Sequence, residues 1–396
     1  MKKKAIGASL SLIALLAGCQ QEEQSQEAGA IRHSLTAPAD TSAVAAAPDS
    51  KAKPLAAEPS AALLYAPLGN AADTLLRIGG RQLYLQLHAR LDTTQRLLAI
   101  TGRDTSASGY QGYFTFVLRD SLHQLVAKRV LTKQVFYKAV GQELAISSGA
   151  SLPVLLGYSA PMKALVFTLN FAAPETDWIC NAVLLLDLQG QVRRLSQGYS
   201  VGGPDVNVEL SHDGRTVLTG TDILRANALA LPLHRPQAEL RGALLLNDSL
   251  ALTVYEFKSN KPAHLADLVS QKVSTASSQN FQSNAFVVNT HNGQLLTCFS
   301  YKGFFEELGV TIPWHRLPAT HTGYFLDDKK GLYLLSEASP THVRLLPFAR
   351  LVKFKPPQRS GEVMFDLHGY SKTYRLYVDT LAPSSIRYTY ERTALD

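Results

Sequence analysis

Short polar turns between paired apolar runs constrain the fold of this chain more than any other feature of its sequence. Asp213-Gly214 and Asn292-Gly293 are such turns, and these dipeptides tolerate the positive φ that a tight hairpin turn requires. The five pairs of runs span Tyr113–Leu131, Ala182–Leu195, Val206–Leu218, Ala285–Phe299 and Tyr324–Leu335. Single runs follow at Val343–Phe354, Val363–Leu367 and Thr373–Val378. Each pair predicts an antiparallel hairpin, so we expect a mainly β chain.

Helical periodicity is clear in one segment, Ala263–Val273, where Leu265, Leu268 and Val269 share a face. The β-rich region is expected to run from residue 61 to residue 396. At roughly 335 residues it exceeds what a single hydrophobic core usually holds. The sequence therefore predicts either a repeat architecture, which grows by adding units, or two domains.

The turn at Asp213-Gly214 carries a resemblance to a known fold. Leu210–Leu218 reads Leu-Ser-His-Asp-Gly-Arg-Thr-Val-Leu and resembles the Ser-Pro-Asp-Gly-Lys turn of TolB-like and WD40-like propellers. Leu185–Gln191 and Val287–Gln294 resemble the strand that follows in such blades. The resemblance implies β-propeller-like repeated antiparallel sheets. Two packed β-sandwich domains stay open as the alternative, because no fixed repeat length is evident.

The first residues form a targeting signal. Three lysines precede an apolar run from Ala5 to Ala17, which has the length of a secretory h-region and is too short to span a bilayer. Leu16-Ala17-Gly18-Cys19 resembles the lipobox of bacterial lipoproteins. That resemblance implies a signal peptide over residues 1–18, cleavage between Gly18 and Cys19, and attachment of diacylglycerol and a further acyl chain such as palmitate to Cys19. Several chains are needed because one chain gives only marginal membrane binding.

Residues 19–60 are expected to form a disordered tether, since they are rich in Ala, Pro, Ser, Glu and Gln. Gln20 follows the lipidated cysteine, where an Asp would have indicated inner-membrane retention. Gln20–Glu23 resembles the acidic export signal of Bacteroidota surface lipoproteins. We therefore expect a lipid anchor in the outer membrane, on either the cell surface or the periplasmic face.

Charge and cysteine content exclude several classes of function. The formal charge of +7 is spread over 396 residues without a dense basic cluster, so no nucleic-acid partner is expected. No cofactor is expected either, since the sequence contains no phosphate-binding glycine loop and no dinucleotide fingerprint. Cys180 and Cys298 have no metal-ligand spacing, so no metal site is predicted. In an oxidising compartment the two form either a disulfide or separate buried thiols.

The sequence contains two kinds of candidate catalytic residue for a hydrolase. Ser200 lies in Gly-Tyr-Ser-Val-Gly-Gly, which resembles the nucleophile elbow of α/β-hydrolases, although a strand pattern follows where that elbow needs a helix. Carboxylate pairs for glycosidic acid–base chemistry occur at Glu306-Glu307, Asp327-Asp328 and Glu175 with Asp177. We expect all of these carboxylates to be solvated loop charges.

Aromatic side chains gather at Tyr301, Phe304, Phe305 and Trp314. If exposed, they would stack on sugar rings or anchor a partner, whereas core packing is the default for such residues. Nearby, His315 and His321 are expected in surface or turn positions. The sequence thus predicts a non-enzymatic binding or scaffold module for a protein or glycan. A lipid-anchored hydrolase that uses Ser200 or a carboxylate pair is the alternative.

Overall fold

The computed structural model describes residues 71–101, 104–226, 229–257, 283–306 and 309–392. The predicted signal peptide, Cys19, the tether and the predicted helix Ala263–Val273 lie outside these residues. Within them the chain is mainly β, as predicted. None of the helices among these residues has the length and apolar character needed to cross a membrane.

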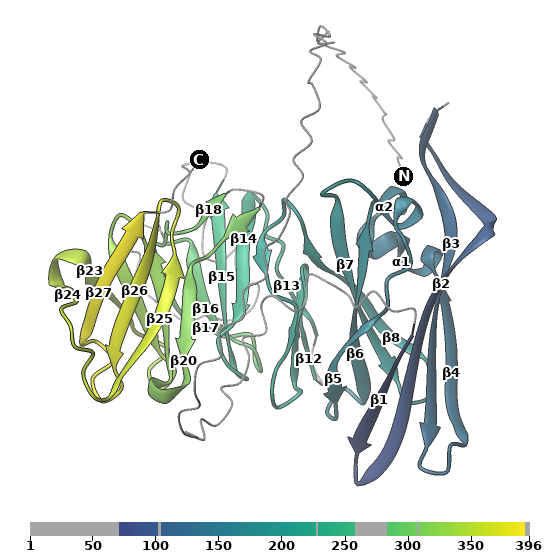
Figure 1. Ribbon diagram of the computed structural model, residues 1–396, viewed down its shortest axis with the longest axis horizontal. Coiled ribbons are helices and arrows are strands. Elements are labelled where there is room, and N and C mark those ends of the chain that lie inside the picture. Colours follow the sequence, from purple (N-terminus) through teal and green to yellow (C-terminus); the bar gives the residue numbers. More distant parts are fainter. Residues whose placement is uncertain (1–70, 102–103, 227–228, 258–282, 307–308, 393–396) are drawn as a thin grey trace, which may run out of the picture. The chain divides into compact units, whose positions relative to one another are not determined.

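Most described strands belong to six sheets of four or five strands (Figure 1). The first sheet contains β1 (Ala71–Ile78), β2 (Arg81–Thr101), β3 (Asp104–Asp120) and β4 (Leu125–Thr132). The second contains β5 (Val154–Ser159), β6 (Ala164–Ala172), β7 (Ile179–Asp187) and β8 (Val192–Ser200). The third contains β10 (Glu209–Leu210), β11 (Thr216–Leu218), β12 (Asp222–Arg225) and β13 (Leu231–Pro232).

The remaining sheets follow in chain order, with two crossovers. The fourth sheet has the order β17 (Leu295–Phe299), β16 (Ala285–Asn289), β15 (Leu250–Phe257), β14 (Ala238–Leu245) and β9 (Asp205–Val206). The fifth contains β20 (Trp314–Leu317), β21 (Thr322–Asp327), β22 (Gly331–Ser336) and β23 (Val343–Pro347). The sixth has the order β24 (Val352–Lys353), β27 (Ile386–Arg392), β26 (Lys372–Asp379) and β25 (Glu362–His368). A two-stranded ribbon, β18 (Phe305–Glu306) with β19 (Val310–Thr311), precedes the fifth sheet. In the two crossovers, β9 pairs with β14 and β24 pairs with β27.

The five predicted hairpins are confirmed. Each predicted turn separates two strands that pair in antiparallel register. The third hairpin begins at Glu209 and not at Val206 as predicted, because Val206 belongs to β9 of the fourth sheet. Gly190, Gly214 and Gly293 adopt φ values of +79°, +69° and +77° at three of these turns. Such values strain residues with a Cβ, so the glycines there fix where each strand ends.

Neighbouring sheets pack face to face through successive apolar clusters. The first and second sheets bury Phe114, Phe116 and Phe167 between them, and ring centroids of Phe116 and Phe167 lie 5.0 Å apart. Comparable clusters join the second to the third sheet, the third to the fourth, the fourth to the fifth and the fifth to the sixth. This continuous series of packed sheets confirms propeller-like repeated antiparallel sheets. Two separate sandwiches would have interrupted the series.

Two short helices were not predicted. α1 (Lys133–Val140) and α2 (Gln142–Ser147) follow β4 and pack against β3. The Lys133 side chain is fully buried, and its Nζ donates hydrogen bonds to the main-chain oxygens of Ile146 and Ser148 at the end of α2. Burial lowers the pKa of Lys133 to about 8. The run Val-Phe-Tyr in α1 favours strand on local preference, so only the tertiary contacts of this segment reveal the helix.

Candidate functional site

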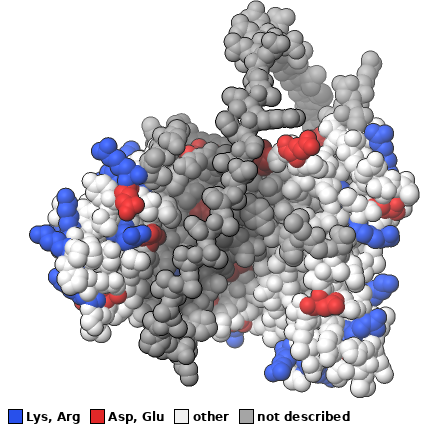
Figure 2. All heavy atoms as spheres, viewed as in Figure 1, with Lys and Arg blue, Asp and Glu red and all other residues white. Residues whose placement is uncertain are grey.

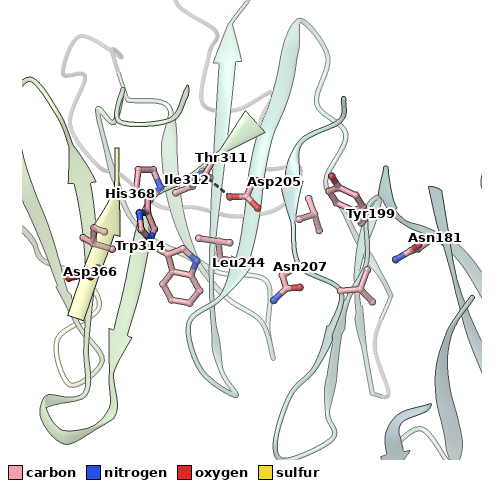
Figure 3. Close-up of a pocket in the computed structure, with 14 residues that line it drawn as sticks. Asn181, Tyr199, Asp205, Asn207, Leu244, Thr311, Ile312, Trp314, Asp366 and His368 are labelled. Carbon is pink, nitrogen blue, oxygen red and sulfur yellow. Dashed lines mark hydrogen bonds between the residues drawn. The ribbon is translucent and has the colours of Figure 1, made fainter. Parts of the chain in front are cut away.

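A cavity of about 410 Å³ lies where strands of four sheets meet (Figure 3). Its walls come from the second, fourth, fifth and sixth sheets and from the ribbon strand β19. The polar residues that line it are Asn181, Tyr199, Asp205, Asn207, Thr311, Asp366 and His368. The apolar ones are Val206, Val208, Leu244, Ile312, Pro313, Trp314 and Leu367. Among these described lining residues there is no Lys or Arg, so the site does not resemble an anion-binding pocket.

The crossover strand β9 builds the wall that carries Asp205. β9 pairs in parallel with β14, where Asp205 lies opposite Gly242. A Cβ at Gly242 would lie 2.3 Å from Ile312 Cδ1 and 2.7 Å from the Asp205 main-chain oxygen. Only glycine allows the three segments to approach this closely, and this close approach positions the Asp205 carboxylate.

Asp205 is the most electrostatically perturbed carboxylate of the cavity. The Ile312 N–H donates to Asp205 Oδ2 over 2.7 Å (dashed line in Figure 3). Burial raises the pKa of Asp205 to about 6, and the Ile312 hydrogen bond offsets only part of this effect. Burial also raises the pKa of Tyr199, and the nearby Asp205 charge contributes to that shift. A carboxylate of this kind accepts hydrogen bonds strongly when its environment is otherwise dry.

The opposite wall holds Trp314 and the β25 residues. The Trp314 ring is half-buried and lies nearly parallel to Phe325, with an interplanar angle of 10° and centroids 5.9 Å apart. Because Phe325 is fully buried, it fixes the plane of the indole. Asp366 accepts two hydrogen bonds of 2.9 Å from Arg375, which lowers the pKa of the carboxyl. Asp366 is therefore ionised and paired with Arg375, whereas Asp205 has no comparable cationic partner in the part of the chain that the structure describes.

The predicted aromatic cluster divides between the core and the cavity. Tyr301 is fully buried between the fourth and fifth sheets, and its hydroxyl donates to the Leu326 oxygen over 2.8 Å. Phe304 packs against the same core, and Phe305 contacts the ring of Tyr370 at 6.1 Å. Core packing thus explains Tyr301 and Phe304, whereas Trp314 packs against the same core and also lines the cavity.

The two histidines near this cluster occupy structural positions. His315 lies in β20 and stacks on Phe365, with ring centroids 4.2 Å apart. His321 follows a turn of 3-10 helix with a φ of 48°, and its side chain is exposed. The predicted turn position is therefore found for His321, whereas His315 contributes to the contact between the fifth and sixth sheets.

The local structure at Ser200 differs from a nucleophile elbow. Ser200 is the last residue of β8, and a turn over residues 201–204 leads directly to β9. Its hydroxyl donates to the Val201 oxygen over 3.5 Å. An elbow needs a strand-to-helix turn that exposes the hydroxyl, and the element that follows here is a strand.

The carboxylate pairs fall into different environments. Glu175 and Asp177 are exposed, as expected. Glu306 forms an ion pair of 2.6 Å with Arg241, and its neighbour Glu307 lies outside the described residues. The expectation of solvated charges is wrong for Asp327, which is 2% exposed and caps its own turn through the N–H groups of the next residues.

Asp328 is half-buried and bridges to the sixth sheet. Its Oδ2 accepts the Tyr370 N–H over 2.9 Å, which joins the β21–β22 turn to the β25–β26 turn. A Cβ at Gly369 would lie 2.2 Å from the Asp328 carboxylate. The two aspartates therefore stabilise loops, because each carboxylate is directed at main-chain amides.

Both cysteines are free thiols in the structure. Cys180 lies in β7 of the second sheet, and Cys298 lies in β17 of the fourth. Burial raises the pKa of Cys180 to about 11, which disfavours the reactive thiolate. Within the described ranges, no group of three or more His, Cys, Asp or Glu side chains gathers in a way that could hold a metal ion.

Sequence reasoning missed most of the cavity. Asn181, Asp205, Asn207, Asp366 and His368 belong to no motif. Asp-Val-Asn-Val at 205–208 does alternate polar with apolar residues; all four line the cavity, and the two valines are also buried in the clusters beside the third sheet. This alternation was the one available signal. It shows which residues share a face but not which distant strands lie opposite.

Comparisons with known proteins leave the family open. No family model matches the chain, and no curated protein matches it. Solved structures with similar chain traces include apo AztD from Citrobacter koseri, at 13% identity and a TM-score of 0.28 over 70% of this chain and 67% of that one. A eukaryotic initiation factor matches at 8% identity and a TM-score of 0.30 over 83% and 79%. Cobalt-substituted Synechocystis ACO matches at 8% identity and a TM-score of 0.24 over 81% and 64%.

Proposed function

We propose that this protein is a lipid-anchored, non-enzymatic binding module whose cavity between the sheets receives a neutral, hydroxyl-rich ligand such as the end of a glycan. The observation that carries the proposal is the composition of the cavity wall. Asn181, Tyr199 and Asn207 offer amide and hydroxyl groups, Asp205 offers a carboxylate, and Trp314 offers an aromatic ring.

Each of these groups suits a sugar. Amides and hydroxyls both donate and accept hydrogen bonds, as sugar hydroxyls do. A carboxylate accepts strongly from hydroxyl donors, and the plane of an indole packs against the apolar face of a pyranose. The cavity volume of about 410 Å³ falls within the usual range for small-ligand sites. The absence of Lys and Arg from the described lining disfavours phosphorylated or carboxylated ligands.

Intrinsic fluorescence offers a direct test, because the chain has two tryptophans. Trp178→Phe removes the one that is 46% exposed on a loop and leaves Trp314 as the sole reporter. We expect neutral oligosaccharides from a panel to shift the Trp314 emission in a saturable manner. Phosphorylated sugars should have no effect.

The matched pair for this titration is Asn207→Ala and Gln294→Ala. Asn207 lines the cavity, whereas Gln294 is an exposed amide in the hairpin of the fourth sheet. Asn207→Ala should weaken binding by about tenfold, since a lost hydrogen bond in a dry site costs about 1–2 kcal/mol. Gln294→Ala should bind normally. Equal affinities of the two variants would refute the assignment of the cavity, as would an emission that no neutral saccharide changes.

The anchor rests on the lipobox resemblance and has its own test. Cells supplied with labelled palmitate should incorporate label into the wild-type chain and not into Cys19→Ser. Protease digestion of intact and lysed cells then separates the cell surface from the periplasmic face. Label that persists in Cys19→Ser would overturn the anchor without affecting the cavity.

A further inference from the structure

The first sheet has one face in the core and one face turned away from it. Along β2, Leu83, Leu85 and Leu87 are buried in the cluster shared with the second sheet. The residues between them alternate to the opposite side, and His88 and Arg90 there are exposed. We call this side the outer face of the first sheet.

Apolar side chains are concentrated on this sheet. In the described part of the chain, nine of the seventeen exposed large hydrophobic residues lie between Leu75 and Val130. On the outer face itself, Leu75 is 47% exposed, Val126 46% and Val130 45%. A grouping of this kind on a folded domain marks an interaction surface more often than isolated exposed residues do.

Basic side chains are interleaved with these apolar ones. Arg77, Arg90 and Lys128 alternate onto the outer face and are exposed. Residues 71–132 contain eight Lys or Arg and four Asp or Glu, a net charge of +4. Figure 2 shows Lys and Arg along the side of the molecule where β1–β4 lie, at the right of the view.

We propose that the outer face of the first sheet docks onto an anionic lipid surface. Basic residues among apolar ones are the combination that interfacial membrane binding uses, because the cations attract lipid phosphates while the apolar side chains enter the headgroup region. A second copy of the chain is a poorer occupant. A two-fold contact through this face would bring the same cations together.

The position of β1 in the sequence also favours a lipid surface as the partner of the outer face. β1 is the first described strand, and it forms the edge of this sheet. Its first residue, Ala71, is separated from Cys19 by 51 residues of sequence. The inference thus extends the proposed anchoring at Cys19, since the sheet that is nearest to Cys19 in sequence is the one that carries the lipid-compatible face.

Vesicle flotation tests the docking without the anchor. The protein is the chain from residue 19 onward with Cys19→Ser, which cannot be acylated there, so docking and lipidation succeed or fail separately. We expect it to float with vesicles that contain roughly one third phosphatidylglycerol and not with pure phosphatidylcholine. Binding at about 0.01 M salt should be lost near 1 M, where the Debye length is only about 3 Å.

Two double variants locate the surface. Arg90→Gln with Lys128→Gln removes two charges from the outer face and should weaken vesicle binding by about 30-fold. Lys353→Gln with Arg359→Gln removes the same charge from exposed positions in and near the sixth sheet and should leave binding unchanged. Equal loss in both variants would refute the assignment, as would equal flotation with both lipids. A salt-resistant dimer that the outer-face variant abolishes would show that a second copy is the occupant instead.

Discussion

Replacing Asp205 by Asn tests whether the cavity imposes an energetic cost on the folded chain. Asn has nearly the same shape and keeps an oxygen that can accept the Ile312 N–H. The substitution removes the charge that burial disfavours and leaves the hydrogen-bond geometry in place. The expected result is a protein that is more stable than wild type at neutral pH.

The magnitude follows from the pKa. Burial raises the Asp205 pKa from 3.8 to about 6, and each pKa unit corresponds to about 1.4 kcal/mol. As pH rises from about 4 to about 6, the Asp205 carboxyl therefore loses its proton in the unfolded chain while it still holds the proton in the folded chain. Over that interval the folded wild type loses up to about 3 kcal/mol of stability relative to the unfolded state. Solvent at the cavity mouth reduces this value, so we expect about 1–3 kcal/mol.

Urea denaturation at a series of pH values measures the effect. Subtracting the wild-type free energy of unfolding from that of Asp205→Asn removes titrations common to both proteins. The difference should be small near pH 4 and should reach about 1–3 kcal/mol above pH 7. A difference that is constant with pH, or that favours the wild type at neutral pH, would refute the reasoning.

Asp366→Asn is the matched control from the same cavity. Arg375 lowers the pKa of Asp366, so its charge contributes stability at neutral pH that is lost as pH falls through the lowered pKa. The variant should be less stable than wild type at pH 7, with the difference shrinking in acid. The two aspartates should therefore show opposite signs.

Three other predictions concern the core and the thiols. Tyr301→Phe should lower the free energy of unfolding by about 1 kcal/mol, because it removes one buried hydrogen bond; an unchanged urea midpoint would contradict this. Gly109→Ala should displace α2, since its Cβ would lie 2.0 Å from the Ile146 oxygen, and faster proteolysis of that region would report the change. In the unreduced native protein Cys180 should resist alkylation and Cys298 should react faster, whereas both should react after denaturation. An unalkylated mass lower by two hydrogen atoms would reveal a disulfide instead.

The hairpins were predictable because their information is local. Turn residues such as Asn292-Gly293 fix a conformation within four residues. The two apolar runs that flank the turn are then adjacent and can pair as antiparallel strands. The position of β9 was not predictable in this way. Its two residues pair with a strand more than thirty residues further along, and no local signal specifies that partner.

The candidate site was harder to predict than the fold for the same reason. Its residues come from strands far apart in sequence, and each is unremarkable alone. Trp314 was singled out as an aromatic residue, but its neighbours Tyr301 and Phe304 proved to belong to the core. Composition could not separate them, because what distinguishes them is where the tertiary structure places each ring: Tyr301 and Phe304 lie in the connection between β17 and β18, and Trp314 begins β20 at the cavity.

The pairing of β9 with β14 also bears on how the protein folds. The segment between these strands contains the whole third sheet. The pairing of β9 with β14 therefore closes this segment into a loop, because the strands that flank it are hydrogen-bonded to each other. In a simple repeat array, units unfold in turn because each contacts only its neighbours. Here the fourth sheet cannot keep its edge strand unless the chain on both sides of the third sheet is in place. Changes of length in the turns of the third sheet should cost little, because closure entropy grows slowly with loop length, whereas changes within its strands should disturb the apolar clusters on both of its faces.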